Sequence, residues 1–145
     1  MKVREAMTED VKLVSPDQTI REAARMMAQC DIGALPVGQH DRLVGMVTDR
    51  DITVRAVAEG RSPDTRIGDV MSRSIMYCFE DDELDNVTYN MGDIQVRRLP
   101  VVDRNKRLVG IVSISDIAAC GDIDKTGQAI GSISMPGGGH SQAAH

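Results

Sequence analysis

Two copies of one sequence pattern make up most of the chain. The strings D-I-G-A-L-P-V and R-L-V-G-M-V-T-D-R-D-I of the first copy are matched in the second by Q-V-R-R-L-P-V-V and R-L-V-G-I-V-S-I-S-D-I. Met7 recurs as Met71 and Leu35 as Leu99 at one constant spacing, which grows by one residue in the turn before Leu108. A repeat this short buries little core alone, so we expect two similar units that pack together and duplicate any binding site.

Each copy has the apolar pattern of a strand, a helix, two strands and a second helix. The elements predicted for the first copy are a strand at Val11–Val14, a helix from Thr19, strands at Leu35–Val37 and Leu43–Thr48, and a helix over Asp49–Glu59. Those predicted for the second copy are a helix that opens in Glu80–Asp85, strands at Val96–Val102 and Arg107–Ser113, and a helix from about Ser115. The predicted fold class is therefore α/β, in the α+β arrangement.

The first predicted helix begins with clear signals. Thr19 and Glu22 have the spacing of a capping box, and an apolar stripe follows at helical period. The stripe consists of Ile20, Ala23, Ala24 and Met27. One face of this helix should therefore be buried.

The domain boundaries follow from the repeat. We expect a first repeat over residues 3–60, a linker over 61–66, a second repeat over 67–120 and a flexible tail over 121–145. The tail is rich in Gly and Ser, and an extended segment at Thr126–Ser134 is the one ordered element considered there.

Charge and cysteine content narrow the function classes. The net charge of −5 and the pI near 5.1 argue against nucleic acid or an anionic membrane as partner. No stretch has the length and apolarity of a signal peptide or a membrane span. The three cysteines include no C-x-x-C pair, which indicates free thiols and a cytoplasmic protein, with Cys30 and Cys78 as small core residues.

The sequence predicts no metal site. His40, His140 and His145 lack the spacing of metal ligands, and two of them lie in the tail. The acidic run Glu80–Asp85 lacks the alternating ligands and central glycine of a calcium loop, and it suits a helix amino terminus.

The junction between the last strand and the last helix of each copy has a hydroxyl residue followed three positions later by an aspartate. These pairs are Thr48 with Asp51 and Ser113 with Asp116. One interpretation is purely structural, because a hydroxyl and an aspartate at this spacing cap a helix. The other is a nucleotide site, in which the hydroxyl donates to a phosphate and the carboxylate accepts from the two ribose hydroxyls. The recurrence of the pair in register favours the second interpretation.

The chain resembles a tandem pair of CBS domains, the regulatory modules named after cystathionine β-synthase. Over about Val3 to Ala119 both copies match the family's closing motif, Gly-h-x-[Ser/Thr]-x-x-[Asn/Asp], and the strand motif that ends in Leu-Pro-Val. The resemblance implies a β-α-β-β-α fold for each repeat, a pseudo-twofold packing of the two sheets, two clefts between the repeats and commonly a homodimer. It also implies an adenosine ligand such as AMP, ADP, ATP, S-adenosylmethionine or NAD.

The resemblance assigns roles to particular residues. Asp51 and Asp116 would hold ribose hydroxyls, and Thr48 and Ser113 would hold phosphate or ribose. The residues that would line the base pocket are Ala34 and Pro36, Arg98 and Pro100, and from the first strands Val11 and Ile75. Aromatic residues are scarce, so the adenine would lie between aliphatic side chains.

The two copies differ beside these positions. Gly33-Ala34 in the first copy stands where the second has Arg97-Arg98, and Asp49-Arg50 stands where the second has Ile114-Ser115. Arg50, Arg97 and Arg98 suit a phosphate, and equally an exposed surface. The two sites should therefore differ in ligand preference. A protein in which only one of the two sites binds a ligand is also compatible with the sequence.

The function predicted from the sequence is a nucleotide-binding regulatory module without catalytic activity, read by a target protein in trans. The main alternative is a structural or stress-related scaffold with vestigial sites. A small nucleotide-processing enzyme is a second alternative, against which the lack of a histidine or cysteine near the motif counts. A sensor that uses Cys30, Cys78 and Cys120 is a third.

Overall fold

The computed structural model describes residues 1–136 as two compact units. The first-repeat unit consists of Lys12–Ile75, and the second-repeat unit combines Met1–Val11 with Met76–His145. The amino-terminal arm, Met1–Val11, therefore belongs to the unit formed mainly by the second repeat. No helix within residues 1–136 is both long and apolar enough to cross a membrane.

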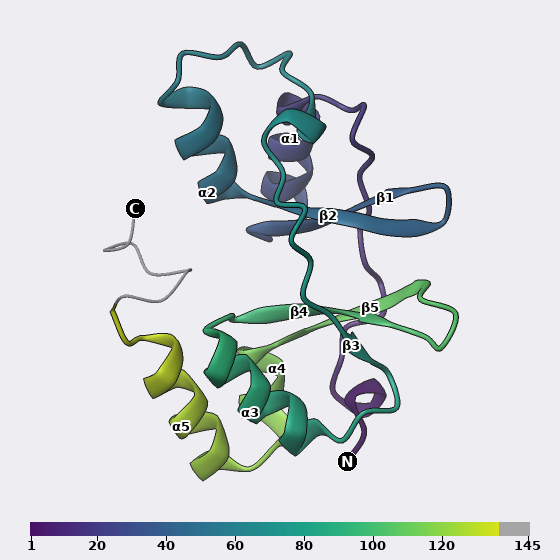
Figure 1. Cartoon of the computed structure of the whole chain (residues 1–145), viewed down its shortest axis with the longest axis vertical. Coiled ribbons are helices and arrows are strands. Elements are labelled where there is room, and N and C mark those ends of the chain that lie inside the picture. Colours follow the sequence, from purple (N-terminus) through teal and green to yellow (C-terminus); the bar gives the residue numbers. More distant parts are fainter. Residues whose placement is uncertain (137–145) are drawn as a thin grey trace. The chain divides into compact units, whose positions relative to one another are not determined.

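The first-repeat unit is a two-stranded antiparallel sheet with both main helices on one side (Figure 1). Its elements are α1 (Ile20–Cys30), β1 (Ala34–Gln39), β2 (Arg42–Thr48), α2 (Asp49–Ile52), the π-helical turn η2 (Thr53–Val57) and the 3-10 turn η3 (Ile67–Asp69). A tight turn joins β1 to β2 through His40 and Asp41, both at positive φ. The core lies between sheet and helices and includes Leu35 and Val47, which the strand pairing places opposite each other.

The second-repeat unit repeats this plan with an added strand and helix. Its elements are η1 (Val3–Glu5), β3 (Cys78–Phe79), α3 (Leu84–Ile94), β4 (Arg98–Val102), β5 (Leu108–Ser113), α4 (Ile114–Cys120) and α5 (Ile123–Ile133). The strand order is β3-β4-β5, with β3 parallel and β5 antiparallel to β4. Its core includes Met91, Leu99 and Val112, together with Val3 from the arm.

The two units are completed by segments that come from outside the strand–helix–strand core of each repeat. The Thr8 N–H donates to the Ile111 carbonyl at 2.8 Å, and the Ile111 N–H donates back to Thr8 at 3.0 Å. Met46 and Ser72 form the equivalent pair of hydrogen bonds in the first-repeat unit, at 3.0 and 2.8 Å. The repeated Met-[Thr/Ser] dipeptides thus act as docking segments.

The repeated glycines of the Leu-Val-Gly strands make this docking possible. A Cβ added at Gly110 would lie 2.8 Å from the Thr8 carbonyl oxygen, and one added at Gly45 would lie 2.7 Å from that of Ser72. A side chain at either glycine would therefore collide with the backbone of the docking segment.

The first strand predicted for each copy is largely absent. In place of a strand at Val11–Val14, Val14 alone forms a parallel bridge to Val37, and the chain then turns at Ser15-Pro16-Asp17. Ile75 also lies outside any strand, since β3 is limited to Cys78–Phe79.

The first helix is capped as predicted, but its buried face is narrower than the predicted apolar stripe. The Thr19 hydroxyl accepts a hydrogen bond from the Glu22 N–H at 3.2 Å, and Ile20 and Met27 are buried with Ala23. Ala24, which was predicted to belong to the buried stripe, is exposed.

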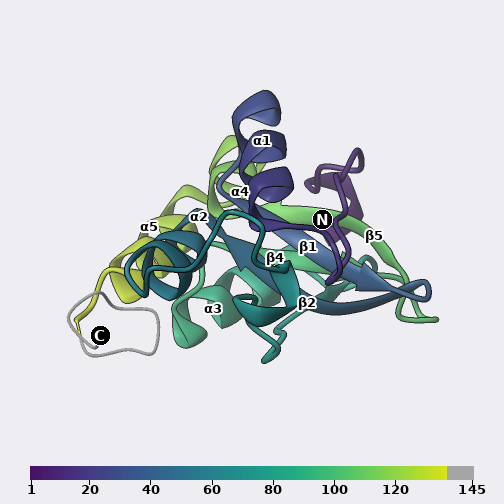
Figure 2. The same ribbon diagram turned by 90° about the horizontal axis from the view of Figure 1, so that it is seen from above.

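Residues 121–145 were expected to form a flexible tail, with an extended segment considered at Thr126–Ser134, but Ile123–Ile133 forms helix α5 alongside α3 (Figures 1 and 2). Asp122 caps it by accepting a hydrogen bond from the Lys125 N–H at 3.0 Å. Gly92 lets the two helices meet closely, because a Cβ there would lie 3.0 Å from the Ala129 Cα. Residues 137–145 belong to the tail that was predicted to be flexible, and they lie outside the described residues. His140 and His145 are among them.

Candidate functional site

The junction of β2 and α2 in the first-repeat unit is closed by a reciprocal pair of hydrogen bonds. The Asp51 N–H donates to the Thr48 hydroxyl at 3.0 Å, and the Thr48 N–H donates to Asp51 Oδ2 at 3.0 Å. Both side chains are half-buried. Two otherwise unpaired backbone donors at the start of α2 are therefore satisfied.

The second-repeat unit has the same arrangement between β5 and α4. The Asp116 N–H donates to the Ser113 hydroxyl, and the Ser113 N–H donates to Asp116 Oδ2, each at 3.0 Å. The capping interpretation is thus realised in both copies. It still leaves each hydroxyl proton and the second carboxylate oxygen available, so capping and ligand binding are compatible.

The residue one helical turn after the aspartate differs between the two junctions. Arg55 Nε lies 3.9 Å from Asp51 Oδ1, and Arg55 Nη1 also donates to the carbonyls of Val70 and Met71 at 3.1 and 3.2 Å. At the matching position of α4, the Cys120 thiol donates to the Asp116 backbone carbonyl at 3.1 Å. No ion pair involves Asp116 within residues 1–136, so its second oxygen has greater accepting capacity.

The sequence alone did not reveal this pairing of Arg55, because its carbonyl partners come from a distant segment. It also missed that Cys120 lies close to Asp116, which weakens the argument from a lack of cysteines near the motif. The spacing of four residues between Asp116 and Cys120 was the available signal.

The charges near the two junctions differ as the sequence indicated. In the first-repeat unit the Asp49 carboxylate accepts a hydrogen bond from the Arg50 N–H at 2.8 Å, so a second acidic group lies at the start of α2. The apolar Ile114 takes that place in the second-repeat unit, where Arg97 and Arg98 are exposed at the beginning of β4. The second junction therefore lacks the additional carboxylate that Asp49 provides at the first.

Strand pairing brings several predicted residues to the junctions. Ala34 lies opposite Thr48, and Arg98 lies opposite Ser113. Pro36 and Pro100, two residues further along their strands, are buried. Strand pairing does not bring in Val11 and Ile75, which are half-buried and outside the strands.

The cysteines have three different environments. Cys78 is buried in the second-repeat unit, and its desolvation, with a smaller contribution from nearby Asp82, raises the pKa of the thiol to about 12. Cys30 is half-buried and Cys120 is exposed. Within residues 1–136 no three His, Cys, Asp or Glu side chains gather closely enough to hold a metal ion.

Comparison with known families identifies the repeats. The model of the CBS domain matches residues 3–57 and 67–120. The chain belongs to the CBS domain family. Each CBS match includes one of the strand–helix junctions described above, and α5 lies beyond the second match.

Relatives of the same organisation include two bacterial proteins. The chain is 45% identical over 116 residues to the CBS domain-containing protein YhcV of Bacillus subtilis, covering 80% of this chain and 82% of YhcV. It is 42% identical over 117 residues to hypoxic response protein 1 of Mycobacterium tuberculosis, covering 79% and 81%. A crystal structure of Hypoxic Response Protein I with two coordinated zinc ions has a TM-score of 0.76 at 39% identity and covers 84% of this chain and all of that one.

One similar structure contains ligands of the adenosine class. The CBS domain pair of protein MJ0100, in complex with 5′-methylthioadenosine and S-adenosyl-L-methionine, has a TM-score of 0.73 at 30% identity. The match covers 82% of this chain and 94% of that pair. These comparisons and the mixed helix and strand content agree with the predicted α+β pair of CBS repeats.

Proposed function

We propose that this CBS pair is a regulatory module that binds an adenosine-containing ligand, with the junction of Ser113 and Asp116 as the principal site. The main support for this choice of site is that no cation within residues 1–136 engages the second carboxylate oxygen of Asp116. Ligands of this chemical class in the complex of the similar MJ0100 pair support the proposal.

The chemistry of a ribose suits this carboxylate. Two vicinal hydroxyls are both donors, and an ionised carboxylate accepts only. Asp116 Oδ2 is engaged by the Ser113 N–H, which fixes the orientation of the carboxylate and leaves Oδ1 to accept from the sugar. In the first-repeat unit Arg55 shares the corresponding oxygen of Asp51, so we expect weaker binding there.

The neighbouring residues suit the other parts of such a ligand. Exposed Arg97 and Arg98 would attract a phosphate or carboxylate group, whereas Asp49 would repel one at the other junction. Pro100 offers an aliphatic surface for the base. AMP, ADP, ATP, S-adenosylmethionine and NAD are therefore the ligands to compare. In this proposal the protein performs no chemistry on the ligand, lies in the cytoplasm, and acts as a dimer on a target protein.

The first prediction compares two matched variants. Asparagine keeps one oxygen to accept the capping N–H and replaces the other by a donor, so Asp116→Asn tests ligand contact with little change to the cap. With the right ligand at about 100 times its dissociation constant, unfolding should cost roughly 2.7 kcal/mol more, visible as a higher unfolding temperature. We expect Asp116→Asn to abolish this gain and Asp51→Asn to keep most of it, measured by calorimetry with the ligand panel.

Two other results would change the conclusion. If no ligand of the panel stabilises the wild type at millimolar concentration, the capping boxes are purely structural and the scaffold interpretation prevails. If bound nucleotide is converted to product in the presence of Mg²⁺, the module is an enzyme. Chromatography of the recovered ligand distinguishes binding from conversion.

A further inference from the structure

Arg55 forms the only ion pair with a junction aspartate in residues 1–136. Its Nε lies 3.9 Å from Asp51 Oδ1, the oxygen that the capping hydrogen bond from the Thr48 N–H leaves free. Only 16% of the Asp51 side chain is exposed, so access to this oxygen is restricted. A ribose that binds at the first junction therefore has to share the oxygen with the guanidinium group or displace that group.

A second set of contacts holds the guanidinium group beside Asp51. Arg55 Nη1 donates to the carbonyls of Val70 and Met71 at 3.1 and 3.2 Å, and Met71 belongs to the docking segment of this unit. Arg55 lies in the π-helical turn η2, whereas the matching Cys120 is the last residue of the α-helix α4. The docking segment thus fixes a cation beside the first junction, and the second junction has no equivalent of it in the described chain.

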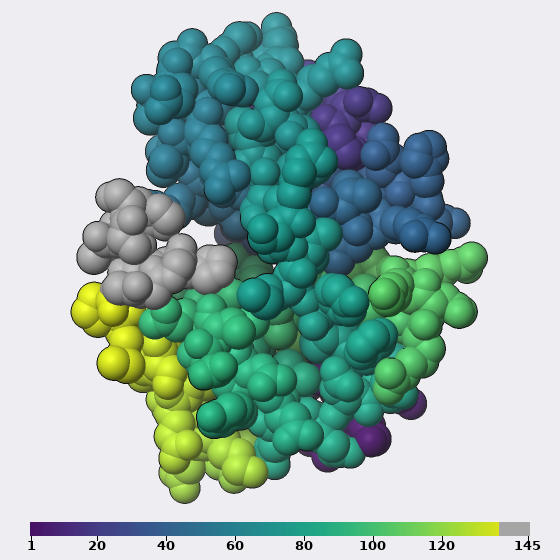
Figure 3. Space-filling model, viewed as in Figure 1, coloured from purple at the N-terminus to yellow at the C-terminus, as the bar shows by residue number. Residues whose placement is uncertain are grey.

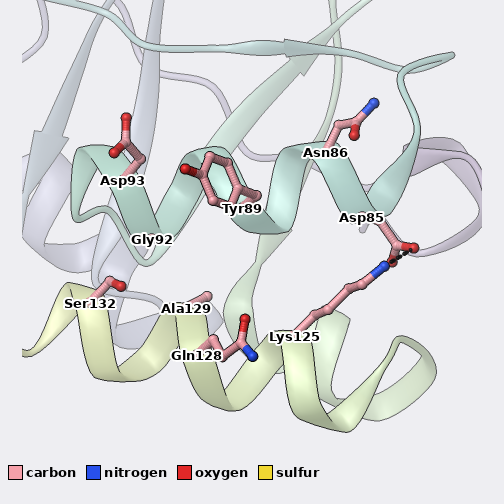
Figure 4. Close-up of a pocket in the computed structure, with 9 residues that line it drawn as sticks. All are labelled: Asp85, Asn86, Tyr89, Gly92, Asp93, Lys125, Gln128, Ala129 and Ser132. Atoms are coloured by element: carbon pink, nitrogen blue, oxygen red, sulfur yellow. Dashed lines mark hydrogen bonds and ion pairs between the residues drawn. The ribbon is translucent and has the colours of Figure 1, made fainter.

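The contact between Arg55 and Asp51 is loose enough to be replaced. A closer ion pair lies in the groove between α3 and α5, where Lys125 donates to Asp85 at 2.8 Å (Figures 3 and 4). The 3.9 Å between Arg55 Nε and Asp51 Oδ1 exceeds hydrogen-bond distance, so charge alone joins these two groups. A ribose hydroxyl can therefore compete for the oxygen, but at reduced affinity.

We propose that Arg55 determines how many ligands the protein binds, because it competes within the chain for the carboxylate of Asp51. At the matching position the Cys120 thiol donates to the Asp116 backbone carbonyl at 3.1 Å and brings no positive charge to the carboxylate. This inference rests on the proposed function and adds the residue that makes the two sites unequal. Exchanging Arg55 and Cys120 should therefore exchange the affinities of the two junctions.

The second prediction concerns titration calorimetry of the full chain with AMP and with 5′-methylthioadenosine, one probe with a phosphate and one without. Arg55→Cys should strengthen binding at the first junction by about fivefold or more, and Cys120→Arg should weaken binding at the second by a similar factor. In the double exchange, Asp51→Asn should remove the stronger site and Asp116→Asn the weaker one. Arg61→Cys, at another exposed arginine of the first-repeat unit, is the control and should change neither affinity.

The outcomes separate this inference from the proposed function. If the wild type binds a probe through Asp116 and Arg55→Cys leaves the first junction unchanged, the role of Arg55 is refuted and the proposed function stands. If neither the wild type nor any variant binds either probe, both are refuted. Binding by Arg55→Cys alone would support the role of Arg55 and would make Asp51, not Asp116, the principal site.

A separate readout distinguishes competition for the ribose from a general change in structure. The gain in Arg55→Cys should disappear with 2′,3′-dideoxyadenosine, which lacks both ribose hydroxyls, and a gain that persists would overturn the proposal. Thermal unfolding without ligand verifies the fold of each variant. If Arg55→Cys does not fold, Cys120→Arg still tests the inference, because it removes no contact of the first-repeat unit; an unchanged affinity at Asp116 would then refute it.

Discussion

At Cys78 and Cys120 the same chemical group is placed in opposite surroundings. Burial raises the pKa of Cys78 to about 12, whereas Cys120 is exposed on α4. The third prediction is that a thiol reagent at pH 8 labels Cys120 rapidly in the folded protein and Cys78 only after unfolding, tested in a Cys30→Ser background by mass spectrometry. Rapid labelling of Cys78 in the folded chain would contradict the buried position.

The raised pKa of Cys78 also predicts a dependence of stability on pH. An unfolded thiol titrates near 9.0, below the folded value. The neutral thiol therefore stabilises the folded state fully below pH 9, and this contribution is lost as the pH rises toward 12. The wild type should lose more unfolding free energy than Cys78→Ala over that interval.

Single residues show what the sequence could and could not indicate about the site. Thr48, Asp51, Ser113 and Asp116 were found because the motif is local, and their hydrogen bonds span three residues. The difference between Asp51, which pairs with Arg55, and Asp116, which has no such partner in residues 1–136, was not predictable. The carbonyl partners of Arg55 belong to a segment whose position only the fold establishes.

Replacing a glycine within a helix or strand should have opposite effects on stability, depending on whether another segment lies against it. The fourth prediction is that Gly110→Ala and Gly45→Ala each destabilise the protein by about 1–3 kcal/mol, because the new methyl group would collide with a docking segment. Gly127→Ala in α5 has no neighbour within 4 Å and should stabilise the protein by about 0.5–1 kcal/mol. Urea unfolding checks all three, and similar effects at all three positions would refute the distinction.

Helices and hairpins were more predictable than the remaining elements, because their signals are contiguous. The capped helix from Thr19 and the paired strands around Leu35 and Leu99 follow directly from local pattern. Helix α5 escaped prediction because Gly127 and Gly131 lower its helix propensity, while its stabilising contact at Gly92 is remote in sequence.

For the whole molecule, the arm makes the second-repeat unit dependent on the beginning of the chain. Val3 is fully buried, and the Val3 N–H donates to the Asp82 carbonyl at 3.0 Å. The fifth prediction is that Val3→Ala lowers the free energy of unfolding by roughly 2 kcal/mol. Hydrogen exchange should then accelerate in α3 and β5, while α1 and β2 remain protected. Faster exchange in α1 and β2 instead would contradict the docking of the arm in the second-repeat unit.

The docking of the arm also sets an order of events during synthesis. The first-repeat unit can close once Ser72 has left the ribosome, since its last docking segment is then present. Thr8 was translated far earlier, yet its partner Ile111 appears only about 100 residues later. The arm, although translated before the first-repeat unit, is thus among the last segments to acquire its native contacts, and until then its apolar side chains are accessible to chaperones.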